Sequence, residues 1–300
     1  MPFKQATRKG TFVLIGLTGH SGSGKTYSAL RLARGLVGAN GRIGALDTEN
    51  GRMSHYSDLT PFDVDELHAP FTPARYVEKI MEARAAKFDC LIIDSFSHEW
   101  EGTGGVIEMA EGGRAASGKE LSGLQKWNKP KAEHKKLVNA VLQSPMHIII
   151  CMRGKDKLVQ MKDEKGKDVI VNTGVVPIQD ARFLFEMTVS LIMQEGKQTP
   201  KIQKCPEALR HLFPENQFIT EAAGAGVAAW VGTGIPLDTA LEDAKIAARD
   251  VAEAGMNALK AHWTSLGGTM QQKLGGETFL NELKSIAKAA DEDAAGRGEL

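Results

Sequence analysis

The chain has 300 residues, enough for one large domain or a domain with an appendage, and its 42% hydrophobic and 25% charged residues are ordinary for a soluble globular protein. The 37 basic and 37 acidic side chains cancel, but residues 1–215 carry 30 basic against 25 acidic side chains and residues 216–300 carry 7 against 12, which indicates two units with different surroundings. Three scattered cysteines exclude a disulfide framework, and no apolar run approaches the roughly 18 residues of a membrane span, so we expect a cytoplasmic protein with no membrane partner.

Strand and helix patterns alternate along the first half of the chain. Apolar runs typical of buried strands lie at 11–19, 41–51, 88–95 and 146–153. Helical patterns lie between them, at 25–37, 71–87 and 129–143. This alternation predicts an α/β fold with a mainly parallel sheet.

The pattern changes after residue 153. Residues 156–172 form two strand-like runs around "EKGK", which predicts a β-hairpin, and residues 180–196 are typical of a short helix that leads into a strand. Further on, the chain is Ala-rich and helical over 237–262 and 276–290.

These patterns predict a core domain over 10–215, a small helical C-terminal module over 216–290 and a disordered acidic tail over 291–300. We expect the residues after about 232 to be separable from the core. Apolar residues recur at helical spacing in the module, which predicts two helices packed on each other, with a docking surface for a protein partner as the alternative: Met256, Leu259, Trp263, Leu266, Leu280, Leu283 and Ile286.

The stretch "GHSGSGKT" separates the first strand from the first helix and fits the pattern G-x-x-x-x-G-K-[ST]. Glycines let successive backbone N–H groups point inward as an anion-binding nest, and the start of the helix adds its positive dipole. Lys25 can then reach the β- and γ-phosphates of a nucleotide, and the Thr26 hydroxyl can bind Mg²⁺. The residues expected to bind ATP phosphates are Gly19, His20, Ser21, Gly22, Ser23, Gly24, Lys25 and Thr26.

A phosphate loop needs a carboxylate for the metal and a group that orients water. Asp94 ends the run "CLIIDS" at the carboxyl edge of a central strand, where it is the candidate metal ligand together with Thr26. Asp47 and Glu49 in "LDTENG" end the second strand, and Glu99 follows Asp94 by five residues. Spacing alone leaves the choice of the water-orienting carboxylate open.

In order and spacing, "GHSGSGKT", "ALDTENG", "CLIIDSFSHEW" and "HIIICMRGK" resemble the motifs of RecA-type recombinase cores, and more closely those of phage-encoded RecA-like ATPases described as AAA-family ATP-binding proteins, some of which anneal single strands. The resemblance covers about residues 10–215. It implies that Glu49 is the catalytic glutamate and Asp94 the Walker B aspartate. Where such cores place a polar sensor, often Asn-Gln, this chain has Cys151-Met152 followed by Arg153, so Arg153 is a candidate substitute.

RecA-like cores hold single-stranded DNA in loops that correspond to residues 98–128 and 154–172. The first segment contains Arg114, Lys119 and Lys126, and Trp100 or Trp127 could stack on bases. The second contains Lys155, Lys157, Lys162, Lys165 and Lys167, diluted by acidic residues. The alternative is that the lysines form an ordinary solvated surface and the tryptophans pack.

The resemblance therefore implies an ATPase that requires Mg²⁺, acts on single-stranded DNA in phage-type recombination or annealing, and works as a homo-oligomer in the cytoplasm of a bacterial host. A neighbouring subunit could lend Lys155 or Arg153 to the γ-phosphate. The alternatives are a nucleotide-dependent loader or assembly ATPase that acts on a protein partner, and a P-loop kinase of a small molecule, which the absence of an evident arginine-rich lid disfavours.

Overall fold

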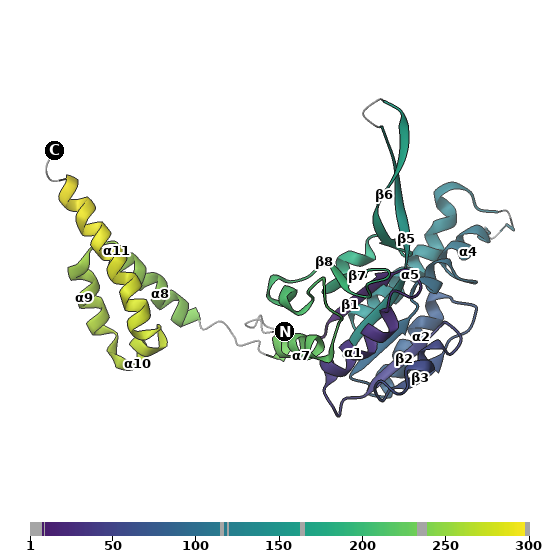
Figure 1. Ribbon diagram of the computed structural model, residues 1–300, viewed down its shortest axis with the longest axis horizontal. Helices are drawn as coiled ribbons and strands as arrows, with labels where there is room; N and C mark the ends of the chain where they lie inside the picture. The colour runs from purple at the N-terminus through teal and green to yellow at the C-terminus, as the bar shows by residue number, and fades with distance from the viewer. Residues whose placement is uncertain are drawn as a thin grey trace. The chain divides into compact units, whose positions relative to one another are not determined.

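The computed structural model describes residue 8 and residues 10–114, 117–118, 120–162, 166–232 and 239–297. Contacts divide the chain into two compact units (Figure 1), a core unit that contains the described residues up to 232 and a C-terminal unit that contains residues 239–297. Each unit is described by itself below.

The described strands of the core unit form one sheet of eight strands in the order β3-β2-β4-β5-β1-β7-β8, with β6 paired to β5. The pairings among β3, β2, β4, β5, β1 and β7 are parallel, whereas β8 and β6 run antiparallel to their neighbours. The strands are β1 (Leu14–Gly19), β2 (Ile43–Asp47), β3 (Asp63–Glu66), β4 (Cys90–Asp94), β5 (His147–Lys162), β6 (Asp168–Pro177), β7 (Val189–Met193) and β8 (Pro200–Lys204).

Helices connect these strands and cover both faces of the sheet. The α-helices of the core unit are α1 (Lys25–Val37), α2 (Pro73–Ala85), α3 (Ser97–Glu101), α4 (Val106–Glu111), α5 (Asn128–Leu142), α6 (Phe183–Glu186) and α7 (Glu221–Gly232). Short 3₁₀ helices lie at Arg52–Tyr56, Gly123–Trp127 and Glu207–Leu212. The α/β fold with a mainly parallel sheet that the sequence predicts is thus confirmed. The sequence patterns missed both edge strands, β3 and β8, and the short helices α3 and α4.

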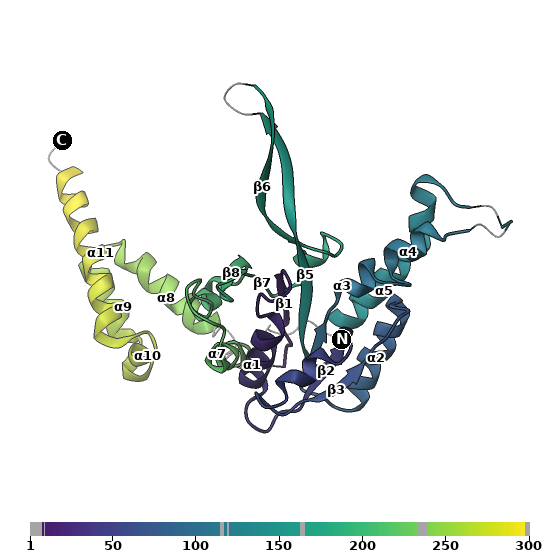
Figure 2. The same ribbon diagram turned by 45° about the vertical axis from the view of Figure 1, so that its right-hand side comes forward.

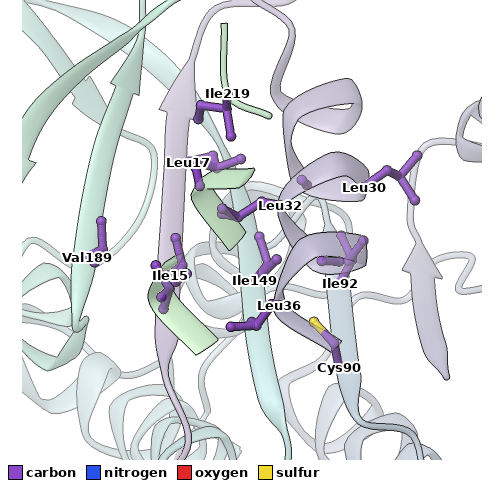
Figure 3. Close-up of a cluster of buried hydrophobic side chains, with 14 of the residues drawn as sticks. Ile15, Leu17, Leu30, Leu32, Leu36, Cys90, Ile92, Ile149, Val189 and Ile219 are labelled. Atoms are coloured by element: carbon purple, nitrogen blue, oxygen red, sulfur yellow. The ribbon is translucent and has the colours of Figure 1, made fainter. Parts of the chain in front are cut away.

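One face of the sheet packs against α1. Figure 3 shows Leu32 and Leu36 of this helix beside Ile15 and Leu17 of β1, and all four are buried. The stripe forms because apolar residues recur every three or four positions along α1, whereas β1, buried on both faces, is apolar throughout. On the opposite face, α2 and α5 bury a second cluster that includes Tyr76 and Leu137. Helices therefore cover the central parallel strands β2, β4, β5 and β1 on both faces, up to the point where β5 leaves the sheet.

Helix α7 lies in the core unit, which corrects the predicted boundary at residue 216. It packs closely on α1, because a methyl group at Gly224 would lie 2.2 Å from the Leu32 carbonyl oxygen and one at Gly35 would lie 1.8 Å from the Glu221 carbonyl oxygen. Arg31 also donates two hydrogen bonds to the Glu221 carboxylate, at 2.8 and 2.6 Å. Only glycine permits this approach, so the small residues of α7 serve helix packing and do not mark a new module.

The C-terminal unit is helical, as predicted, and consists of α8 (Thr239–Ala252), α9 (Met256–Ser265), α10 (Gly267–Lys273) and α11 (Gly276–Arg297). The single helix expected over 237–262 is two helices, which are separated near Gly255, whose φ of 98° lies outside the helical region. Leu259 of α9 and Leu283 of α11 are buried in one hydrophobic cluster. Helix α11 extends through most of the tail that we expected to be disordered.

Beyond the sheet, β5 continues into a long hairpin with β6. Figures 1 and 2 show this hairpin projecting from the rest of the core unit. It corresponds to the hairpin predicted over 156–172, but its second strand runs on to Pro177. None of the described helices is long and apolar enough to cross a membrane.

Candidate functional site

The parallel register gathers the polar ends of four strands at one edge of the sheet. Asp47 of β2 is level with Asp94 of β4, and Asp94 is level with Cys151 of β5. One residue beyond Met152, Arg153 is level with Gly19, the last residue of β1. Because the carboxyl ends of parallel strands meet at one edge, segments far apart in sequence supply one site.

The phosphate loop leaves β1 at Gly19 and enters α1 at Lys25. Gly22 has a φ of 78° and Gly24 a φ of 84°, both in the left-handed region that favours glycine. Ser23 is buried and closes the loop on itself by donating its hydroxyl to the His20 carbonyl, at 2.8 Å. This hydrogen bond ties the two sides of the loop together.

Lys25 folds back over this loop. Its Nζ donates to the carbonyl oxygens of Gly19 and His20, at 2.9 and 2.8 Å. Those bonds hold a cation above the nest, where phosphate oxygens would compete for it. The His20 side chain points elsewhere, with Nε2 3.3 Å from a carboxylate oxygen of Asp156 at the base of the hairpin.

Thr26 and Asp94 meet at the bottom of the site. The Thr26 hydroxyl donates to Oδ2 of Asp94 at 2.6 Å. Burial raises the pKa of Asp94 to about 6, and the nearby Glu49 carboxylate adds to this, while the Thr26 hydrogen bond and Lys25 oppose it. A buried carboxylate that is costly to ionise is suited to a cation, and two hard oxygen donors next to a phosphate nest fit Mg²⁺. The described residues contain no group of three or more acidic, His or Cys side chains that could hold a metal by themselves, so phosphate oxygens and water would have to complete the shell.

Asp47 has a different role from the water-orienting one considered for it. It is buried, and its two carboxylate oxygens accept the backbone N–H groups of Glu49 at 2.6 Å and Met53 at 2.8 Å. Both oxygens are thus committed to the loop that follows β2. Asp47 holds Glu49 in place.

Glu49 faces the phosphate loop across the cavity. Its Oε1 accepts two hydrogen bonds from the Arg153 guanidinium, at 3.1 and 2.9 Å, and Arg52 lies 3.2 Å from Oε2. Burial alone would raise the pKa of Glu49, but the hydrogen bonds and charges of these arginines outweigh it and lower the pKa below the ordinary value. The carboxylate is ionised and restrained.

Glu99, the rival of Glu49, points into the interior. It is fully buried, with Oε1 3.0 Å from Nδ1 of His134 and Oε2 accepting a hydrogen bond from Gln179 at 3.1 Å. Trp100 packs edge-on against the same histidine, with ring centroids 5.3 Å apart. Glu99 is therefore separated from the phosphate loop, and the tryptophan beside it is engaged in packing.

A cavity of about 900 Å³ lies between the phosphate loop, Asp94 and Glu49. The predicted residues that line it are Ser21, Gly22, Gly24, Lys25, Thr26, Asp47, Glu49, Asp94 and Arg153. Residues that we did not predict complete the walls: Tyr27, Arg52, Met53, His55, Tyr56, Glu101, Gly154, Ile178 and Gln198. Of these, Tyr27 and Gly154 directly follow the predicted residues Thr26 and Arg153. Gln198 reaches the loop from the turn between β7 and β8, where its φ of 56° is unusual for a residue other than glycine.

The two segments predicted to hold DNA flank this edge of the sheet. In the first, Trp127 has the ammonium groups of Lys126 and Lys131 at 6.0 and 5.6 Å from its ring centroid. In the second, Lys155 and Lys157 are exposed at the base of the hairpin. Trp127 is half-buried. Cations beside an accessible aromatic ring are typical of single-strand binding surfaces, and they also occur on ordinary surfaces.

Comparison with known proteins identifies the family of the chain. No curated protein matches the chain. The matching solved structures include a KaiC-like protein from the hyperthermophilic archaeon Pyrococcus horikoshii OT3, which is 15% identical, covers 69% of this chain and 90% of its own, and superposes with a TM-score of 0.34. A family model described as an AAA domain matches residues 11–201, which include the phosphate loop, Asp94 and Arg153. The chain belongs to this AAA family of P-loop NTPases.

Proposed function

We propose that the protein is an ATPase that requires Mg²⁺ and couples ATP hydrolysis to work on single-stranded DNA, in recombination or annealing of the phage type. The observation that carries the ATPase is the Thr26–Asp94 hydrogen bond of 2.6 Å, since it joins the phosphate loop to an acidic strand end beneath a cavity that Glu49 also lines. A metal ion between these oxygens would neutralise charge on the β- and γ-phosphates.

Each residue has a role that follows from its position. The loop amides and the start of α1 bind phosphate oxygens, and Lys25 exchanges its two carbonyl partners for them. Glu49 orients the attacking water and accepts its proton. To do so it must leave Arg153, and the γ-phosphate offers that arginine a competing anion in the same cavity.

Single-stranded DNA is the proposed polymer because basic residues surround the same edge of the sheet. The exposed lysines at the base of the hairpin lie in β5, directly after Arg153 and Gly154 of the nucleotide cavity. Trp127 with its two lysines lies in the segment between β4 and β5. Contacts there would lie close enough to Asp94 and Arg153 to alter turnover.

The test is the ATP hydrolysis rate of the full chain with and without single-stranded DNA, with Lys25→Ala as the inactive control. We expect Mg²⁺-dependent hydrolysis that DNA accelerates at low salt and that the Lys25 variant lacks. Hydrolysis without acceleration by DNA contradicts the DNA proposal and leaves the assembly ATPase. Equal turnover in the Lys25 variant contradicts the ATPase itself.

A further inference from the structure

The hairpin that projects from the core unit has no partner along most of its length. In the residues described, β6 pairs only with β5, from Gly154–Pro177 at the base to Lys162–Asp168 near the tip. Both views show it extending beyond the helices that cover the sheet (Figures 1 and 2). We call its described residues, 154–162 and 166–177, the arm. A two-stranded hairpin by itself is marginally stable in water, so an arm of this length needs a partner surface.

Aliphatic side chains are exposed on both faces of the arm. Leu158 is 62% exposed, Met161 51%, Ile170 73% and Val171 39%. By the ladder register, Leu158 and Ile170 lie on one face, whereas Met161 and Val171 lie on the other. Large aliphatic residues exposed together mark an interaction site.

Beyond the lysines at its base, the chemistry of the arm favours a protein partner over a nucleic acid. Bases of single strands stack on aromatic rings in a positively charged groove. The described residues of the arm include no aromatic residue, and Asp156 and Asp168 offset part of the charge of its lysines. Aliphatic residues framed by lysines instead fit a protein surface that is apolar and acidic.

The chain itself carries such a surface, at the far edge of the sheet. In the described sheet β3 pairs with β2 alone, so its outer N–H and C=O groups have no ladder partner there. All four of its residues are exposed, including Val64 at 41%, and Met81 on the neighbouring helix α2 is 51% exposed. A hollow of about 200 Å³ with Ala83 and Phe88 in its wall lies between β3 and α2. We call residues 63–66 with Met81 and Glu82 the acidic edge.

Charge on the two surfaces is complementary. The acidic edge has four carboxylates, those of Asp63, Asp65, Glu66 and Glu82. Asp65 and Glu82 share Lys79 at 2.8 Å each, Asp63 pairs with Arg42 at 3.1 Å, and Glu66 lies 3.5 Å from His68, so the acidic side chains outnumber the cations beside them. Beyond the two lysines at its base, which are proposed above to contact DNA, the arm has Lys162 and Lys167 among its exposed residues. Opposite charge around matching apolar centres is what steers two surfaces together and sets their orientation.

We propose that the arm of one copy docks on the acidic edge of a second copy. The aliphatic side chains would cover Val64 and Met81, and the arm's lysines would meet the carboxylates around them. Because arm and edge are different surfaces, the contact is head-to-tail. In an open assembly one terminal copy has a vacant arm and the other a vacant edge, so copies can keep adding until a ring closes. The proposal does not depend on ATP hydrolysis.

The test compares self-association of the full chain and three variants by sedimentation velocity. Ile170→Glu places an acid on the arm, and Met81→Lys places a base on the acidic edge. Leu142→Lys, on α5 outside both surfaces and 44% exposed, is the control. Thermal unfolding midpoints should stay close to that of the unmodified chain, because all three side chains are largely solvated.

We expect the unmodified chain and the control to form concentration-dependent assemblies, and each arm or edge variant to associate at least ~10-fold more weakly. The decisive sample is the equal mixture of Ile170→Glu and Met81→Lys. It retains one intact arm and one intact edge, so it should form dimers but nothing longer. A monomeric unmodified chain, normal assembly of either variant, or no dimers in the mixture would overturn the proposal, as would an Ile170→Glu variant that assembles normally and loses only single-stranded DNA binding.

Discussion

Two glutamates that follow neighbouring strands, Glu49 after β2 and Glu99 after β4, have opposite surroundings. Glu49 borders an open cavity and is held by two arginines, whereas Glu99 is sealed in the interior with His134 and Gln179. Both follow strand ends at the same edge of the sheet. The difference shows that proximity to a strand end does not make a carboxylate catalytic. What matters is whether the local turn directs it to solvent and ligand or into the layer of helices behind the strand.

The largest expected effect is a loss of stability when the buried Glu99 is replaced. Glu99→Ala removes the acceptor of two buried donors, which should lower the free energy of unfolding by about 3 kcal/mol while hydrolysis per folded molecule stays nearly normal. Denaturant unfolding measures the loss. Glu101→Ala, on the same helix but exposed, is the matched control and should change stability little. Equal stability of the two variants would mean that the buried cluster contributes nothing.

On the open side the effect should be catalytic. Glu49→Gln should bind ATP and Mg²⁺ but hydrolyse ATP ~100-fold more slowly, because a general base contributes about that much. Single-turnover hydrolysis with nucleotide-binding measurements separates the two steps. Glu99→Gln, assayed per folded molecule, serves as the control. If it shows the catalytic loss and Glu49→Gln does not, the two assignments are reversed.

The contact between α7 and α1 is a second buried region in which a substitution should affect stability. Gly224→Ala forces a methyl group toward the Leu32 carbonyl and should cost about 2 kcal/mol in stability, despite the better helix propensity of alanine. Gly232→Ala, at the end of the same helix and facing open space, should be neutral or slightly stabilising. Thermal unfolding of both variants tests this. Equal midpoints would show that α7 is not tightly packed on α1.

The smallest expected effect is a gain of stability, on replacing Asp94. Because burial raises the pKa of Asp94 to about 6, the folded protein binds a proton more readily than the unfolded chain, and the ionised group destabilises the fold as pH rises through that range. Asp94→Asn should therefore stabilise the nucleotide-free protein at pH 7 by on the order of 1 kcal/mol, with the gain fading below about pH 4. The same variant should lose the added stability that Mg-ATP gives the unmodified chain. A destabilised variant at pH 7 would contradict the burial argument.

The sequence predicts the parts of the site that depend on local pattern. The phosphate loop is specified by a contiguous motif between a strand and a helix, and Asp94 by the four apolar residues before it. The choice between Glu49 and Glu99 is beyond such reasoning, because it depends on His134 and Gln179, which approach from distant segments. Glu101 and Gln198 line the cavity for the same reason, with no signal of their own.

For the fold, alternating patterns predict most elements within a few residues, but domain membership is harder. Helix α7 is Ala- and Gly-rich like the helices that follow it, so composition groups them together. Its place is fixed by Gly35 and Gly224, which lie far apart in sequence and whose missing side chains let two helices touch. The edge strand β3 was missed because all four of its residues are exposed and three are acidic, which removes the apolar pattern that identifies a strand.

The continuity of β5 has a mechanical consequence. One strand runs from the centre of the sheet, past Arg153, into the arm, and Gly154 lies so close to Gly19 that a methyl group there would be 3.1 Å from the backbone of the phosphate loop. The part beyond the sheet, residues 154–162, spans about 30 Å at the usual rise of a strand. The arm therefore starts at Arg153 and Gly154, which line the nucleotide cavity, and ends far from it. A tilt of about 5° at Arg153 would move the tip by roughly 2–3 Å over that length, a distance comparable to a hydrogen bond. If the loss or gain of one phosphate group beside Arg153 tilts β5 by this angle, the far end of the arm moves far enough to make or break contacts.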